Sequence, residues 1–70
     1  MDNNELKNAL LNKKAVIYKS HDNIDLNFKC VSAIRYTENN GGVEVSAELT
    51  DLNNKSVTIC DPKRIRYKEV

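Results

Sequence analysis

Alternation between apolar and polar side chains over residues 24–37 is the feature that most restricts the fold of this chain. The intervening positions are mainly polar, and a period of two is typical of a β-strand with one buried face. The pattern predicts one long strand, or two strands joined by a bend near Ser32, where Val31 and Ala33 interrupt the polar face. Seven residues share the inner parity: Ile24, Leu26, Phe28, Cys30, Ser32, Ile34 and Tyr36.

Further strands follow from the same periodicity and from the turns between them. Residues 38–42 contain two asparagines and two glycines, which tolerate the positive φ angles of tight hairpin turns. We expect Val57 and Ile59 to face inward on a later strand, beyond a turn at residues 51–55. The predicted strands span approximately 15–20, 24–37, 43–50, 56–61 and 65–69. The inner face of the strand at 43–50 is expected to consist of Val43, Val45, Ala47 and Leu49.

A short helix is predicted before the first strand, at residues 4–12. Asn3 and Asn4 are good N-cap candidates, and Leu6 and Leu10 recur at helical spacing. So short a helix is unstable alone, so both leucines should dock onto the strands. A second helical feature, a single tight turn, is expected where Pro62 stops the fourth strand.

The 70 residues leave room for one hydrophobic core, so we expect a single domain over residues 1–70. The order of helix and strands predicts an all-β fold, a small five-stranded antiparallel barrel of SH3-like or Sm-like type with a short N-terminal helix. Closure would remove the unpaired edges that a flat sheet exposes. An open sheet with the helix packed across it is the alternative.

The first half of the chain resembles the Sm-like proteins, a family that includes bacterial RNA chaperones of the Hfq type. The resemblance lies in the helix around Leu6–Leu10, in the apolar run Ala15–Tyr18 and in the strand residues 24–34, with Ile65-Arg66 similar to the family's last strand. It implies a barrel topology, ring or dimer formation and RNA binding. The residues with which the family contacts RNA before its last strand are replaced here by Asp61-Pro62-Lys63-Arg64, so none can be carried over.

The chain lacks the motifs on which catalysis depends. It has one histidine, His21, which lies in a predicted polar turn, and no paired metal-ligand, phosphate-loop or nucleophile motif. We therefore expect no enzyme activity, no catalytic residue, no metal and no cofactor. Strand parity predicts that Cys30 points inward and Cys60 outward, so no disulfide is expected between them.

Basic residues concentrate at the end of the chain, although the formal net charge is only +1. In a five-stranded barrel the last strand lies beside the first, near Lys13, Lys14 and Lys19. Such a stripe, with Tyr18, Tyr36 and Tyr67 as stacking platforms, predicts a non-catalytic binding module for RNA or DNA. Basic charges on terminal strands also simply prevent edge pairing, and that interpretation stays open. The predicted nucleic-acid-binding residues are Lys63, Arg64, Arg66 and Lys68.

Acidic residues gather around the central hairpin, which supports a different function. A molecule that is basic near its ends and acidic in the middle suits a protein-interaction module, for example a small regulator or inhibitor. Its partner would be a charged protein or a second copy of the chain, with strand exchange at an edge as the mode. The start of the sequence is polar and acidic, which predicts a cytoplasmic protein without membrane contact. The acidic residues concerned are Glu38, Glu44, Glu48 and Asp51.

Overall fold

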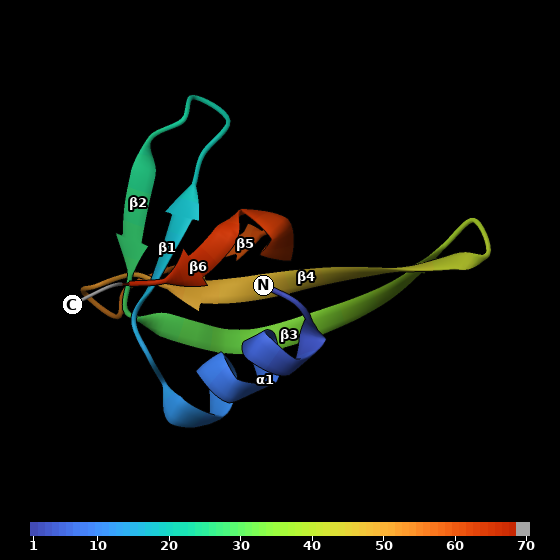
Figure 1. Ribbon diagram of the computed structural model, residues 1–70, viewed down its shortest axis with the longest axis horizontal. Helices are drawn as coiled ribbons and strands as arrows, with labels where there is room; N and C mark the ends of the chain where they lie inside the picture. Colours follow the sequence, from blue (N-terminus) through green and yellow to red (C-terminus); the bar gives the residue numbers. More distant parts are fainter. Residues whose placement is uncertain (69–70) are drawn as a thin grey trace.

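The computed structural model describes residues 1–68 as one helix, six strands and a short 3₁₀ helix (Figure 1). The predicted last strand, 65–69, is present as three residues, and position 69 lies outside the described residues. In chain order the elements are α1 (Asn3–Asn12), β1 (Val16–Lys19), β2 (Asp25–Phe28), β3 (Cys30–Asn39), β4 (Gly42–Thr50), β5 (Val57–Cys60), η1 (Pro62–Arg64) and β6 (Ile65–Tyr67).

The strands form two separate antiparallel sheets of three strands each, in the orders β2-β1-β6 and β3-β4-β5. The prediction of a five-stranded all-β barrel is therefore wrong, and the fold is a small mixed arrangement of one helix and two sheets. The long strand predicted at 24–37 is interrupted at Lys29, whose N–H donates to the carbonyl oxygen of Thr50. At that point the chain stops pairing with β1 and joins the second sheet.

Helix α1 packs against β3, as Figure 1 shows. Its N-cap is Asp2, whose carboxylate accepts a hydrogen bond from the N–H of Glu5, while the Glu5 side chain accepts one from the N–H of Asp2. This reciprocal capping box satisfies two donors that the first turn leaves open. The helix ends at Lys13, in the left-handed region at φ 51°. Leu6 is buried and Leu10 packs on the core, which confirms the predicted docking.

The core lies between the helix and the two sheets, and it draws residues from α1 and all six strands, with Pro62 of η1 also buried. Among residues 1–68 no polar or charged residue is buried. The packing of the two sheets therefore depends on a few apolar side chains, and each of them contributes a large share of the buried apolar area. The residues of this core cluster are Leu6, Ala9, Val16, Phe28, Val31, Ala47, Leu49, Cys60 and Ile65.

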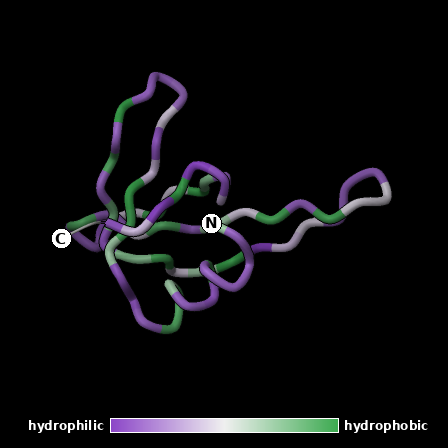
Figure 2. The backbone as a smooth tube through the Cα atoms, in the orientation of Figure 1, coloured by the Kyte–Doolittle hydropathy of each residue, from purple (hydrophilic) through white to green (hydrophobic). Residues whose placement is uncertain are grey.

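Strands β3 and β4 form a long hairpin, closed by a tight turn at Asn40-Gly41. Both turn residues have positive φ, 51° and 81°, as the composition predicts. The far part of this hairpin, residues 35–46, projects from the rest of the molecule and is called the arm below (Figure 1). Figure 2 shows that apolar positions continue along it.

A β-bulge in β3 changes which residues face the core. Val31 pairs with Leu49 and Ala33 with Glu48, so Ser32 is the extra residue. Val31 is buried and Ser32 is exposed, the reverse of the predicted parity. The bend expected near Ser32 is present, and the inner face resumes at Ile34.

The parity predicted for β5 is also wrong. Cys60 lies opposite the buried Ala47 and is itself buried, whereas Val57 and Ile59 are 57% and 54% exposed. Cys30 is half-buried and lies opposite Thr50, on the other face from Val31. Both cysteines are free, with their predicted orientations exchanged.

Candidate functional site

Arg64, one of the four predicted nucleic-acid-binding residues, is used inside the molecule. It lies at the end of η1, and its Nη1 donates to the carbonyl oxygens of Lys19 and Ser20, at 3.2 and 3.1 Å. These contacts hold the 3₁₀ helix against the end of β1. The guanidinium therefore stabilises the turn after β1, and a ligand would have to compete with these two hydrogen bonds.

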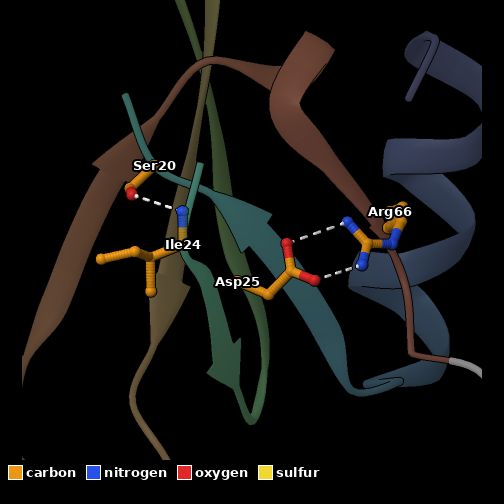
Figure 3. A network of polar contacts seen from close by, with 4 residues as sticks. All are labelled: Ser20, Ile24, Asp25 and Arg66. Atoms are coloured by element: carbon orange, nitrogen blue, oxygen red, sulfur yellow. Dashed lines mark hydrogen bonds and ion pairs between the residues drawn. The ribbon is translucent and has the colours of Figure 1, made fainter. Parts of the chain in front are cut away.

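Arg66 forms an ion pair with Asp25 on the other side of β1 (Figure 3). The 2.8 Å distance joins Nη2 and Oδ2. The hydrogen bond from Arg66, together with its positive charge, holds the pKa of Asp25 below its ordinary value. Next to this pair, the N–H of Ile24 donates to Oγ of Ser20, which closes the β1–β2 turn. A carboxylate thus sits within the predicted basic stripe and reduces its attraction for phosphate.

Lys63 and Lys68 lie at the two ends of the predicted basic segment, in η1 and directly after β6. Lys68 follows β6, where its N–H donates to the carbonyl oxygen of Ala15, and Lys63 lies in η1 beside a groove described below. The predicted neighbourhood of the first and last strands is confirmed by the pairing of β1 with β6. Next to this strand pair, Nζ of Lys14 lies 5.6 Å from the ring centroid of Tyr67, within cation–π range.

The three tyrosines do not form a common stacking surface. Tyr18 and Tyr67 pack against the core, and the hydroxyl of Tyr67 donates to the carbonyl oxygen of Glu5. Tyr36 is 54% exposed, and it lies on the arm rather than beside the basic residues. Base stacking next to the stripe is therefore restricted to partly covered rings.

The arm carries an exposed apolar row on the face that continues the core. Tyr36 lies opposite Val45 and Glu38 opposite Val43, and Val43 is 67% exposed. The other face is polar, with Glu44 and Glu48, and Arg35 forms an ion pair with Glu48 at 3.7 Å. Of the predicted acidic cluster, only Glu38 and Glu44 thus lie on the arm, whereas Glu48 and Asp51 lie closer to the core or beyond β4.

A groove of about 720 Å³ lies at the base of the arm, between the start of α1, η1 and β4. It has a mixed lining in which Asp2, Glu44, Asp61 and Lys63 are the charged side chains. Cys60 also lines the groove. Burial raises the pKa of its thiol. The apolar part of the lining consists of Met1, Leu6, Val43, Val45, Ile59 and Pro62.

One edge of β4 is unpaired beside this groove. Strand β5 pairs with β4 only over Ala47–Thr50, because the chain leaves the strand ladder after Cys60 and turns into η1, which lies next to β4 across the groove. Within residues 1–68 no strand pairs with β4 on that side between Gly42 and Ser46. The sequence pattern did not predict this site, because it placed strands of similar length at 43–50 and 56–61, whereas β5 covers only Val57–Cys60.

Two further observations bear on chemistry. His21 lies exposed in the β1–β2 turn, as expected for a loop residue. In the described part of the chain, no three histidine, cysteine, aspartate or glutamate side chains come together as a group that could hold a metal ion. No helix of residues 1–68 is long and apolar enough to cross a membrane.

Comparison of the chain with family models, with curated proteins and with solved structures gave no match. The resemblance of the first half to the Sm-like proteins therefore stays a prediction.

Proposed function

We propose that this protein is a non-catalytic protein-interaction module that contacts its partner through the arm and the groove at its base. The observation that carries the proposal is the exposure of Tyr36 and Val43 on a hairpin that projects from the core. Apolar side chains on a projecting element gain burial only when a partner covers them, and exposed apolar surface of this kind is typical of binding sites. We also propose a cytoplasmic location, where two free cysteines are stable.

RNA or DNA binding through Lys63, Arg64, Arg66 and Lys68 is the competing proposal. Its support is the gathering of basic residues on the neighbouring strands β1 and β6. Against it, Arg64 binds backbone carbonyls and Arg66 binds Asp25, so phosphate would have to compete with contacts already made. Lys63 lines the groove beside β4. These contacts favour the protein-interaction proposal.

The proposal is tested by using the protein as bait in an extract of its source cells, with bound proteins quantified by mass spectrometry. The test variant combines Tyr36→Ser with Val43→Ser. The matched control combines Ile24→Ser with Leu52→Ser, two residues that are similarly exposed, at 56% and 60%, but lie outside the arm. We expect a partner that the wild type and the control retain and that the arm variant loses.

The competing function is tested by titration with labelled single-stranded RNA at about 50 and about 200 mM salt. We expect no tight binding at either concentration. Micromolar RNA binding that weakens steeply with salt and disappears with Arg64→Glu and Arg66→Glu would overturn the proposal. A partner that the arm variant retains as well as the control does would overturn it too.

A further inference from the structure

The free edge of β4 presents main-chain donors and acceptors to the groove. In a hairpin with a two-residue turn, the pair that flanks the turn is hydrogen-bonded, and bonded pairs then alternate along the strands. Asn39 and Gly42 flank the turn, so the N–H and C=O groups of Val43 and Val45 point away from β3. Two backbone hydrogen bonds agree with this alternation: the Thr50 carbonyl accepts from the N–H of Lys29 on the β3 side, and the Asp51 N–H donates to the carbonyl of Ser56 on the β5 side.

The space beside this edge suits an extended segment. Residues 42–46 span about 17 Å in strand conformation. The adjacent groove of about 720 Å³ lies within the range of about 300–1,000 Å³ that is usual for ligand sites. A segment added there would continue the line of β5, whose last paired residue is Cys60, opposite Ala47. Addition of a strand to an exposed sheet edge is a common mode of peptide recognition.

The two faces of β4 specify different side chains on such a segment. Residues directly opposite each other in antiparallel strands point to the same face. Side chains opposite Val43 and Val45 would therefore meet the apolar lining, which includes Leu6 and Pro62. Side chains opposite Glu44 would point to the polar face. The groove carries three carboxylates, of Asp2, Glu44 and Asp61, against Lys63 and the amino group of Met1, so a net negative charge of one remains. The carboxylate of Glu44, directly opposite the alternate positions, thus favours basic residues there.

A second copy of the chain fits this edge less well. A symmetric antiparallel pairing that used all of residues 42–46 would be centred on Glu44. It would place the two Glu44 side chains directly opposite each other, and like charges in that position destabilise a strand pair. The occupant that fits is a segment of another protein.

We infer that the free edge of β4 between Gly42 and Ser46 binds an extended peptide segment of alternating apolar and basic residues, added as a strand to the sheet. This inference rests on the proposed function and specifies its site and the chemistry of its partner.

The test uses an acetylated, fluorescent peptide of about seven residues that alternates valine and lysine, which is long enough to cover the whole edge from Gly42 to Ser46. Binding is measured by fluorescence anisotropy and mapped by amide chemical shifts. We expect binding with the largest shifts at Val43 and Val45, and about tenfold weaker binding to Glu44→Lys. The matched control is Glu38→Lys, an acidic residue on the same arm that does not line the groove and should change affinity little.

Two control peptides separate strand addition from simple charge attraction. The first alternates valine and glutamate, and the second is the valine–lysine peptide with N-methylated valines, which cannot donate main-chain hydrogen bonds. Neither should bind. Equal binding of the N-methylated peptide, an equal effect of Glu38→Lys, or absence of binding by the valine–lysine peptide would overturn the inference. If that happens while the arm variant still loses its protein partner, the proposed function stands and only the strand-addition site fails.

Discussion

Arg66 holds the carboxylate of Asp25 with both terminal nitrogens of its guanidinium, at 2.8 Å from Nη2 to Oδ2 and 3.4 Å from Nη1 to Oδ1. The two residues lie on β6 and β2, the strands on either side of β1. The contact therefore joins the two outer strands of the first sheet across the central one. A residue predicted to bind nucleic acid has a structural partner within its own domain.

This ion pair predicts a pH dependence of stability. The pKa of Asp25 is lowered from its ordinary value of 3.8, so the folded state favours the ionised carboxylate. The stabilisation is complete above the ordinary pKa and is lost as the pH falls through the lowered value. Urea unfolding of the wild type and Asp25→Asn should differ near neutral pH and converge in acid. A difference that persists below the lowered pKa would contradict the assignment. Added salt should reduce it near neutral pH, since the pair is exposed.

Leu49 is predicted to be a main contributor to folding stability, because it is fully buried at the centre of the core. Leu49→Ala should lower the free energy of unfolding by about 2–5 kcal/mol, through lost burial and the cavity left behind. Leu52→Ala is the matched control, since Leu52 is 60% exposed, and it should change stability by less than about 0.5 kcal/mol. Urea denaturation of both variants measures this, and equal effects would show that the second sheet packs differently.

The two thiols are predicted to differ in reactivity. Cys60 is 3% exposed, and burial raises the pKa of its thiol, so less thiolate is present at a given pH. Cys30 is half-buried and lies on the other face of the sheet. Single-thiol proteins made with Cys30→Ala and Cys60→Ala should show slower alkylation of Cys60 by iodoacetamide. The two rates should become similar in concentrated urea, and equal rates in the native protein would contradict the placement of Cys60.

The start of α1 is predicted to depend on the Asp2 side chain. Its carboxylate accepts from the N–H of Glu5 at 2.8 Å. Asp2→Ala should lower the free energy of unfolding by about 1 kcal/mol, whereas Asp2→Ser keeps an acceptor and should restore most of it. Thermal unfolding followed by circular dichroism measures both. If serine and alanine have the same effect, the cap does not stabilise the helix.

Local features of the fold could be predicted from the sequence because they depend on neighbouring residues. The Asn40-Gly41 turn follows from tolerance of positive φ, and the η1 turn follows from Pro62 after Asp61. The parity of β5 could not be predicted from its own residues. Val57 and Ile59 are more apolar than Thr58 and Cys60, but pairing with β4 turns them outward.

The arrangement of the strands required information that no local pattern carries. Barrel closure was wrong because the chain changes sheets at Lys29, through a backbone hydrogen bond to a residue far along the sequence. The basic stripe was predicted from spacing alone, and spacing does not show that Arg66 meets Asp25 across a strand. The groove was missed because it arises from the unequal lengths of β4 and β5.

The bulge at Ser32 has a consequence for how this domain could diversify. Val31 and Ala33 already occupy successive positions opposite Leu49 and Glu48, so deleting Ser32 would leave every other side chain of β3 on its present face. Bulges bend and twist the strand that carries them. A one-residue deletion would thus change the direction in which the hairpin points while keeping its contact residues, and related chains could reach differently shaped targets in this way.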